Sequence, residues 1–213
     1  MSPSVAVVDY GIGNLLSVSR ALEKCGAKVM LTDDPAQISQ AQRLVLPGVG
    51  AFKDGMDGLR ARALIGTLRD FAVTGRALLG ICLGMQMLLD FSEEFGTHEG
   101  LGLIPGRVLP IPATSPSGVP HKIPHIGWNE LQAPAATKWA GTILDLVRPG
   151  SSVYFVHSFT AFPDDPSCRL ADASYDGCLV SAAIRKGNIY GCQFHPEKSG
   201  EVGLNVLRQF LTL

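Results

Sequence analysis

The stretch that most constrains this chain covers residues 77–89, ALLGICLGMQMLL. An apolar run stops at Cys82, and a segment of strong helix formers begins directly after it. Gly80 and Gly84 bracket the cysteine, as in a nucleophile elbow, where flanking glycines leave room for a strained turn between a strand and a helix. Such a turn would place the thiol at the tip of a sheet and at a helix N-terminus, where the partial positive charge favours the thiolate.

A second interpretation of Cys82 stays open at this point, because a free cysteine is more often a small buried hydrophobic residue than a nucleophile. The cysteines, at positions 25, 82, 168, 178 and 192, are odd in number and show no C-x-x-C spacing. This distribution argues against a disulfide framework and against a zinc site. We expect no metal and no cofactor. It fits a protein of the reducing cytoplasm.

Length and composition narrow the class of protein further. A chain of 213 residues with 46% hydrophobic and 17% charged residues suits one globular domain, or at most two, with a substantial core. The net charge of −1, without a long run of like charge, predicts neither nucleic acid nor an anionic membrane as a partner. No apolar run approaches the roughly 18 residues that span a bilayer, and the N-terminus lacks the basic segment of a signal peptide.

The first half of the chain alternates between strand and helix patterns. A short run rich in β-branched residues at 5–8 predicts a strand buried on both faces, and two further strands are predicted at 28–31 and 43–46. Residues 15–25 and 59–71 have helical patterns. This alternation predicts an α/β fold with a doubly wound, mainly parallel sheet and helices on both faces. Ligands of such sheets bind beyond the carboxyl ends of the strands, so residues 47–50 and Cys82 should face one crevice.

The second half of the chain has a different pattern. Residues 105–134 are rich in proline and should be irregular, with short strands at 106–109 and 128–131. Trp128 in this region is either a lid over the core or an interface anchor. Short strand patterns at 152–156, 170–174, 180–185 and 189–194, separated by turns, predict antiparallel pairing, and a helix should cover 202–211.

The last predicted strand leads into residues 193–199, QFHPEKS. Pro196 should push His195 into an extended conformation, and residues two apart in an extended chain project to the same side. Glu197 can then reach the His195 ring and fix its tautomer. A histidine held by a carboxylate and presented to a thiol is the general-base arrangement of nucleophilic catalysis. The alternative is a solvated turn with a chance His and Glu, and the presence of the Cys82 elbow weighs against it.

Together, residues 80–86 (GICLGMQ) and 194–197 (FHPE) resemble the class I, triad-type glutamine amidotransferase family, and residues 47–50 (PGVG) match its oxyanion segment. The resemblance implies a single glutamine amidotransferase domain over residues 1–213. It also implies that Cys82 attacks the side-chain amide of glutamine, that His195 transfers the proton and that Glu197 orients His195. A glutamyl thioester would form on Cys82 and be hydrolysed to glutamate.

The same resemblance implies roles for further positions. The backbone N–H groups of Leu83 and Val49 would stabilise the oxyanion. The positions that match the family's glutamine-holding residues are Gly48, Gly50, Gln86, Glu94, Ser158 and Phe159. A carboxylate at Glu94 would suit the substrate ammonium.

Other motifs narrow the resemblance within the family. Residues 9–15 (DYGIGNL), 124–129 (PHIGWN), 154–158 (YFVHS) and 195–199 (HPEKS) are similar to those of glutaminase subunits of imidazole glycerol phosphate synthases, which act in histidine biosynthesis. This implies a heterodimer with a cyclase subunit, a (β/α)8 barrel that uses the ammonia to make imidazole glycerol phosphate and an aminoimidazole carboxamide ribotide. The matching docking positions are Asn14, Trp128, Asn129, Tyr154 and Lys198. Residues 113–122 match no motif and should form a variable loop.

A partner is also expected on physical grounds. The predicted catalytic groups span positions 48–197, which leaves no separate acceptor domain. Ammonia released into neutral water would be protonated and lose its nucleophilicity, so direct delivery to a docked subunit is expected. The alternatives are a γ-glutamyl hydrolase, which needs no acceptor, a binding module, which should lack a triad member, and a glutaminase serving anthranilate or p-aminobenzoate synthase.

Overall fold

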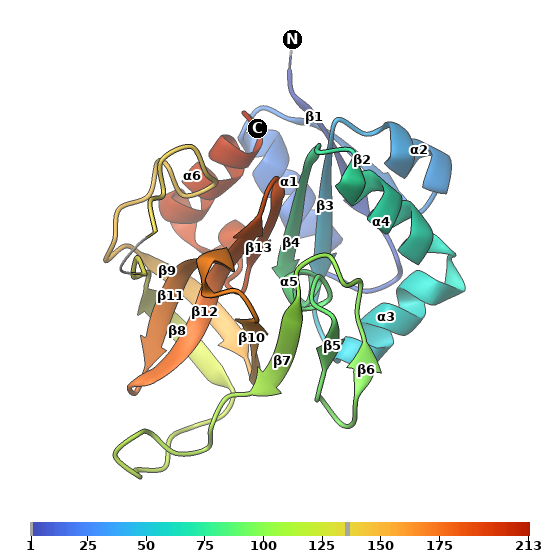
Figure 1. Ribbon diagram of the computed structural model, residues 1–213. Helices are drawn as coiled ribbons and strands as arrows, with labels where there is room; N and C mark the ends of the chain where they lie inside the picture. The colour runs from blue at the N-terminus through green and yellow to red at the C-terminus, as the bar shows by residue number, and fades with distance from the viewer. Residues whose placement is uncertain (1, 135–136) are drawn as a thin grey trace.

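A central sheet organises the computed structural model, which describes residues 2–134 and 137–213. Its seven strands have the order β11-β12-β13-β4-β3-β1-β2 (Figure 1). Their bounds are β1 Ser4–Val8, β2 Lys28–Thr32, β3 Arg43–Gly48, β4 Ala77–Cys82, β11 Arg169–Tyr175, β12 Cys178–Lys186 and β13 Ile189–Cys192. Neighbouring strands from β2 to β13 pair in parallel, whereas β12 pairs antiparallel with both β13 and β11. This arrangement confirms the predicted mixed, mainly parallel sheet with antiparallel strands in the C-terminal part.

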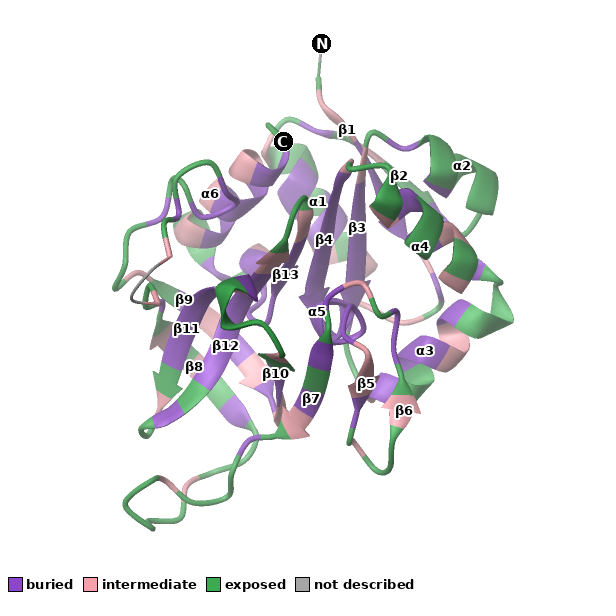
Figure 2. Cartoon of the chain, viewed as in Figure 1, coloured by how far each residue is buried: buried purple, intermediate pink, exposed green. Residues whose placement is uncertain are grey.

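Helices cover both faces of the sheet, as predicted (Figure 1). On one face lie α1 (Leu15–Lys24) and α6 (Gly200–Phe210). On the other face lie α2 (Pro35–Gln40), α3 (Phe52–Ala61) and α4 (Leu64–Val73). Because successive strand residues point to opposite faces, β4 contributes to both cores and is buried along its whole length (Figure 2).

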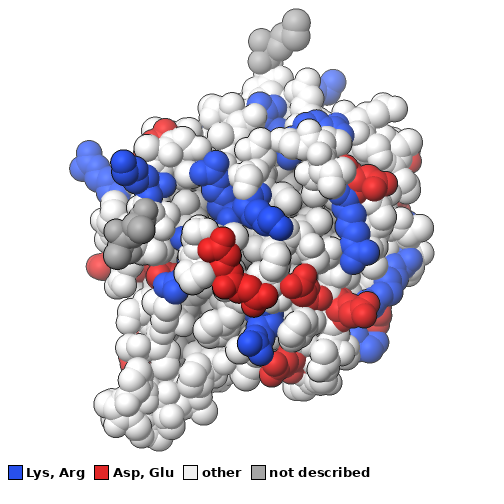
Figure 3. Space-filling model, viewed as in Figure 1, with Lys and Arg blue, Asp and Glu red and all other residues white. Residues whose placement is uncertain are grey.

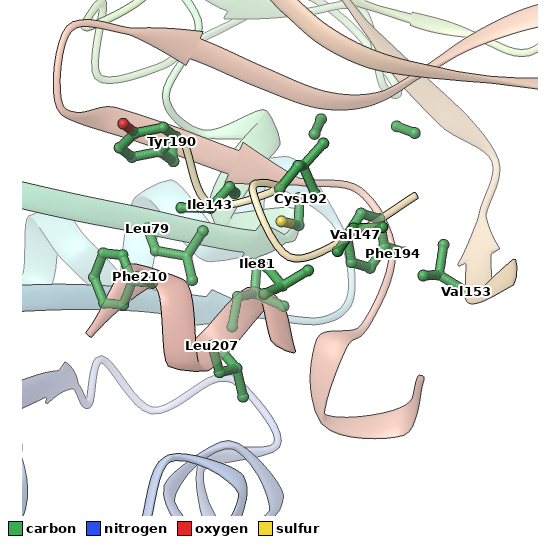
Figure 4. Packing of buried hydrophobic residues seen from close by; sticks show 14 of the residues in the cluster. Leu79, Ile81, Ile143, Val147, Val153, Tyr190, Cys192, Phe194, Leu207 and Phe210 are labelled. Atoms are coloured by element: carbon green, nitrogen blue, oxygen red, sulfur yellow. The ribbon is translucent and has the colours of Figure 1, made fainter. Parts of the chain in front are cut away.

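The two cores differ in their helices but share the central strands. Leu79 and Ile81 of β4 pack with Leu207 and Phe210 of α6 in the core drawn in Figure 4. Leu78, which directly precedes Leu79, points to the other face and belongs to the opposite core, which contains the buried side chains of α3 and α4. Burial on both faces explains why these strands are continuous apolar runs.

Two smaller sheets adjoin the central one. The first has the order β10-β7-β5-β6, with β5 Phe91–Ser92, β6 His98–Glu99, β7 Gly106–Pro110 and β10 Phe159–Pro163. The second is an antiparallel pair of β8 (His125–Glu130) and β9 (Ser152–His157). Of these strands, only β7, β8 and β9 correspond to predicted ones, and β8 begins three residues before the predicted range of 128–131.

The predicted helix over residues 59–71 is wrong in its extent. The chain forms α3 and α4 instead, separated by Ala63 in the left-handed conformation at φ 54°. The first of these helices also begins earlier than predicted, at Phe52, whose backbone N–H donates to Glu94 Oε2 at 2.6 Å. An acceptor from a distant segment therefore caps α3, and the local sequence pattern could not reveal it.

The segment between β7 and β8 projects from the body of the molecule (Figure 1). Residues 111–120 contain no Lys, Arg, Asp or Glu, and this projection is correspondingly white in Figure 3. An isolated bridge joins Thr114 to Pro120, and the Tyr175 hydroxyl donates to the carbonyl of Lys122 at 2.6 Å. The segment 113–122, predicted to be a variable loop, is thus an exposed arm fixed at its base.

Close backbone packing behind the elbow yields a test of the fold. A Cβ atom added to Gly84 would overlap the carbonyl group of Leu46 in β3, whereas one added to Gly66 in α4 would meet nothing within 4 Å. We therefore expect Gly84→Ala to lower the free energy of unfolding in urea by about 2 kcal/mol or more. As a matched control, Gly66→Ala should raise it by about 0.5–1 kcal/mol, because alanine favours helix. Equal stability of the two variants would contradict this packing.

Candidate active site

The ends of three parallel neighbours define the site. In β3, Gly48 is in register with Cys82 of β4, and Ile81 of β4 is in register with Cys192 of β13. The segments that follow these strands therefore leave the sheet at the same level. As predicted, the segment after β3 and Cys82 share one crevice, which also receives His195.

Cys82 occupies a strained turn, as predicted for a nucleophile elbow. Its backbone angles are φ 54° and ψ −109°, a conformation that non-glycine residues rarely adopt. Gly80 approaches the backbone of Gly84 so closely that a Cβ atom on Gly80 would lie 2.6 Å from its carbonyl oxygen. The helix that follows, α5 (Leu83–Gln86), has only four residues and is shorter than the sequence pattern suggests.

His195 and Glu197 form a buried pair. Glu197 Oε1 accepts a hydrogen bond from His195 Nδ1 at 2.8 Å, and the two side chains are 2% and 1% exposed. His195 is extended, as predicted, at φ −96° and ψ 98°. The contact itself crosses a 3-10 turn, η2 (Pro196–Lys198), and not the extended chain that the sequence pattern suggested, because proline is well tolerated at the first position of such a turn.

The environment of His195 favours its charged form. Burial by itself lowers the pKa of the imidazole, but the interactions with Cys82 and Glu197 outweigh burial and raise the pKa to about 9. Nδ1 is held by Glu197, and Nε2 is buried without a hydrogen-bond partner among the described residues. The ring therefore carries two protons at neutral pH, and its Nε2–H is available on the side of the cavity.

A cavity of about 290 Å³ connects these groups. Its lining residues are Val49, Gly50, Cys82, Leu83, Gln86, Glu94, Pro124, Val156, His157, Ser158, Phe159 and His195. The structure thus gathers the predicted catalytic, oxyanion and glutamine-holding positions around one space, except for Gly48 and Glu197, which do not line it. Gly48 lies behind the wall, where an added Cβ atom would meet the Tyr10 hydroxyl at 2.5 Å.

Hydrogen bonds hold the polar walls of this cavity. Gln86 Nε2 donates to the carbonyl of Phe159 at 3.2 Å, which ties the turn after β4 to the start of β10. Tyr10, buried after β1, donates its hydroxyl to the carbonyl of Pro47 at 2.7 Å and so fixes the segment that precedes Val49. The predicted site positions therefore rest on elements distant in sequence.

Two buried histidines, His125 and His157, support the part of the cavity wall that contains Phe159, and no role was predicted for either from the sequence. His157 Nδ1 lies 2.7 Å from the Phe159 carbonyl oxygen, so it must donate, and its Nε2 accepts from His125 Nδ1 at 3.0 Å. Burial lowers the pKa of His157 to about 3 and that of His125 to about 4, so both rings are neutral at pH 7. In the sequence, the only indication of this role is that each of the motifs PHIGWN and YFVHS, which form most of β8 and β9, contains one histidine.

Ser199 is a further residue that the sequence analysis did not single out. Its hydroxyl donates to the His195 carbonyl at 2.6 Å and accepts from the backbone N–H of Tyr154 at 3.0 Å. The His195 N–H also donates to the Tyr154 carbonyl at 3.0 Å. These bonds fasten the backbone that carries the histidine to β9. Only the position of Ser199 in the HPEKS motif hinted at this role.

Three of the five predicted docking residues form one group on the surface. Trp128 and Tyr154 are partners in the β8–β9 register, with ring centroids 6.2 Å apart. Lys198 places its Nζ 5.9 Å from the centroid of the Tyr154 ring. Trp128 is 59% exposed and therefore forms no lid over the core. We call Trp128, Tyr154 and Lys198 the aromatic–lysine cluster.

The other two predicted docking residues lie elsewhere or are engaged internally. Asn14 is half-buried and directly precedes α1, where its carbonyl accepts from the Val18 N–H at 3.2 Å. Asn129 is half-buried, and its side-chain amide donates to the Ser174 carbonyl at 2.9 Å.

In residues 2–134 and 137–213, no cluster of three or more His, Cys, Asp or Glu could hold a metal ion. None of the helices in these ranges is both long and apolar enough to cross a bilayer.

The fold is that of a glutamine amidotransferase, and the sequence profile of the family described as Glutamine amidotransferase class-I matches residues 6–213. The sequence is 56% identical over 211 residues, 99% of both chains, to imidazole glycerol phosphate synthase subunit HisH 1 of Legionella pneumophila (strain Lens). It is 46% identical to the HisH subunit of Geobacillus sp. (strain WCH70), over 98% of this chain and 96% of that relative. The chain therefore belongs to the class-I glutamine amidotransferase family and, within it, to the HisH subunits of imidazole glycerol phosphate synthase.

Structural similarity extends beyond these relatives. A chain in the structure of PurLQS from Thermotoga maritima matches with a TM-score of 0.71 and 22% sequence identity, covering 100% of this chain and 99% of that one. At this identity the similarity concerns the fold alone, and it agrees with the α/β architecture predicted from the sequence.

The neutral histidines generate a prediction about stability in acid. In the unfolded chain, His125 and His157 regain a pKa near 6.5, so between about pH 6.5 and 4 the unfolded state binds more protons than the folded state. The free energy of unfolding should therefore fall as the pH is lowered through this window, by up to about 1.4 kcal/mol per pH unit for each histidine. His195 adds no slope there, because its raised pKa leaves it protonated in both states.

Urea unfolding at a series of pH values across this window measures the slope directly. The variant His157→Gln should lose about half of it, because one of the two titrating rings is gone. An unchanged slope in that variant would contradict the conclusion that His157 is neutral in the folded protein and becomes protonated on unfolding.

Proposed function

We propose that Cys82, His195 and Glu197 form the catalytic triad of a glutaminase that hydrolyses glutamine to glutamate and ammonia and passes the ammonia to a cyclase subunit. The observation that supports this most directly is geometric. A cysteine on a strained elbow and a histidine held by a carboxylate open onto one cavity. The chain that carries them is 56% identical to a HisH subunit over 99% of both chains.

In the first half-reaction, the Cys82 sulfur attacks the carbon of the glutamine side-chain amide as a thiolate. His195, doubly protonated at neutral pH, donates its Nε2 proton to the amide nitrogen as the carbon–nitrogen bond breaks. Ammonia leaves, and a glutamyl thioester remains on the sulfur. Glu197 keeps the ring in the required orientation through its bond to Nδ1.

In the second half-reaction, His195, now neutral, takes a proton from a water molecule that attacks the thioester. The carbon–sulfur bond breaks, glutamate leaves, and the thiolate and the charged imidazole are restored. Both tetrahedral intermediates carry an oxyanion, which the backbone N–H groups of Leu83 and Val49 would stabilise. The loss of one such donor typically costs about 10²–10³ in rate.

The remaining lining residues suit the rest of the substrate. Glu94 extends a carboxylate to the cavity and would pair with the α-ammonium group of glutamine, while one of its oxygens caps α3. Gln86, Ser158, Phe159 and Gly50 also line the cavity, whereas Gly48 packs behind its wall against Tyr10 and Leu83 and would keep the oxyanion segment in place. We propose these six residues as the glutamine-binding set.

A partner subunit is the proposed destination of the ammonia. The relatives are named as subunits of imidazole glycerol phosphate synthase, and ammonia that reached neutral water would be protonated. The proposed partner is a cyclase with a (β/α)8 barrel that forms imidazole glycerol phosphate and an aminoimidazole carboxamide ribotide in histidine biosynthesis. Asn14, Asn129 and the aromatic–lysine cluster are its proposed docking residues. Residues 1–213 would act as one glutaminase domain.

The proposed site of action is the reducing cytoplasm. Each of the cysteines, at positions 25, 82, 168, 178 and 192, is a free thiol in the structure. A thiol nucleophile also requires a compartment in which it is not oxidised.

Glutamate release from glutamine tests the function. It should be measured for the chain alone, with the cyclase subunit, and with the cyclase and its ribulosyl phosphate ligand. We expect activity that rises with cyclase and ligand and that Cys82→Ala abolishes. Activity indifferent to the cyclase would instead favour a γ-glutamyl hydrolase or the glutaminase of another synthase. Glutamate release by Cys82→Ala would overturn the proposed nucleophile.

The proposed docking of the cyclase subunit leads to a separate prediction. Trp128 is a large, exposed aromatic side chain of the kind that dominates binding energy at interfaces. Trp128→Ala should weaken cyclase binding by about 30-fold or more, as measured by titration calorimetry. Val73, which is 85% exposed at the end of α4, offers a matched control, and Val73→Ala should leave the affinity unchanged. Equal affinities for the two variants would remove the aromatic–lysine cluster from the interface.

A further inference from the structure

A second glutamine, Gln193, lies completely buried beside the proposed nucleophile. It directly follows β13, and its backbone N–H donates to the Ala182 carbonyl of β12 at 2.9 Å, so the sheet pairing holds its backbone. Because Cys192 is in register with Ile81, Gln193 comes level with Cys82. A buried amide is costly unless both of its ends are paired, so its partners are informative.

The hydrogen bonds determine which end of the Gln193 amide faces the sulfur. Gln86 Nε2 donates to the Phe159 carbonyl at 3.2 Å, and a carbonyl can only accept, so Gln86 must present its NH2 group on this side. The same NH2 group lies 3.0 Å from Gln193, which must therefore present its oxygen to Gln86. The NH2 group of Gln193 is then turned to Cys82, with Nε2 3.8 Å from Sγ.

An amide donor at this place has a specific chemical use. A hydrogen bond is stronger when its acceptor is ionised, so an N–H group aimed at the sulfur stabilises the thiolate more than the thiol or the thioester. Unlike His195, a neutral amide neither takes nor gives up a proton at neutral pH, so it cannot compete for the proton that the leaving ammonia needs.

We propose that Gln193 is a further catalytic residue, whose side-chain amide donates a hydrogen bond to the Cys82 thiolate, and that Gln86 is the positioning residue that orients this amide. The proposal rests on the proposed function, because it requires Cys82 to be the nucleophile. It also gives Gln86 a task besides contact with substrate. Through Gln86, the sulfur is connected to Phe159 in the wall that would hold glutamine.

Two variants of Gln193 distinguish the loss of its hydrogen-bond donor from a change in the volume of its side chain. Gln193→Met keeps an unbranched side chain of similar length and removes the donor, and Gln193→Glu keeps the shape and replaces the NH2 group by an oxygen. Neither variant replaces a residue that lines the cavity, because Gln193 lies behind the lining residues Gln86 and Cys82. Gln37→Met on the exposed face of α2 is the matched control.

The first readout is the pH profile of Cys82 alkylation by iodoacetamide in the isolated chain, followed by mass spectrometry of the peptide that contains Cys82. Loss of the donor should move the midpoint of this profile to higher pH by about one unit in Gln193→Met. The shift should be larger in Gln193→Glu, where a carboxylate faces the thiolate. Gln37→Met should have the profile of the wild type.

The second readout is glutaminase kinetics in the complex with cyclase and ligand. We expect kcat to fall about tenfold in Gln193→Met while KM for glutamine stays within about twofold, because the lost interaction is with the nucleophile and not with the substrate. Gln86→Met should move the alkylation midpoint in the same direction, because the Gln193 amide loses its orientation. It should also raise KM.

Unchanged alkylation profiles and unchanged kcat in both Gln193 variants would overturn the proposal. If thermal unfolding shows that one Gln193 variant does not fold, the other and Gln86→Met carry the test. A failure of the proposed function would look different, because wild-type protein would then release no glutamate or Cys82→Ala would remain active. A Cys82-dependent wild type with indifferent Gln193 variants would refute this inference alone.

Discussion

The site depends on the close approach of three backbone segments around the end of β4. Gly80 faces the backbone of Gly84, Gly84 packs on the carbonyl of Leu46, and Gly48 packs on Leu83. Side chains at these positions would force the elbow away from β3. Because α5 is a single turn, the strained conformation of Cys82 cannot be maintained locally, and it persists because the surrounding sheet packing leaves no other path. Precise placement of the sulfur is therefore a property of the sheet.

Histidines in two different environments surround this elbow. His195 lies between a carboxylate and a thiol, and these partners raise its pKa against the effect of burial. His125 and His157 are buried next to each other and to a backbone carbonyl, so burial lowers the pKa of both. One ring is thus charged and available for proton transfer, while the other two are neutral and serve as hydrogen-bonding supports. The sign of each shift follows from the charge of the neighbours.

The β8–β9 ribbon connects the proposed docking face with the cavity. Its exposed side carries Trp128 beside Tyr154, whereas His125 is buried against His157, which lines the cavity. A subunit that binds the exposed side would therefore contact the same two strands that form a wall of the site. A subunit bound there would be separated from the cavity only by this pair of strands.

The sequence by itself determined the central strands, the outer helices α1 and α6, and the positions of Cys82 and His195, because apolar periodicity and turn chemistry act over a few residues. Tertiary structure alone decided the break between α3 and α4 at Ala63, the two-residue strands β5 and β6, and the partners of Gln193. Those features depend on backbone and side-chain groups that are distant in sequence, such as the Glu94 carboxylate that caps α3. A local sequence pattern does not show which distant group will contact a given residue. That contact is determined by the packing of the complete sheet and its helices.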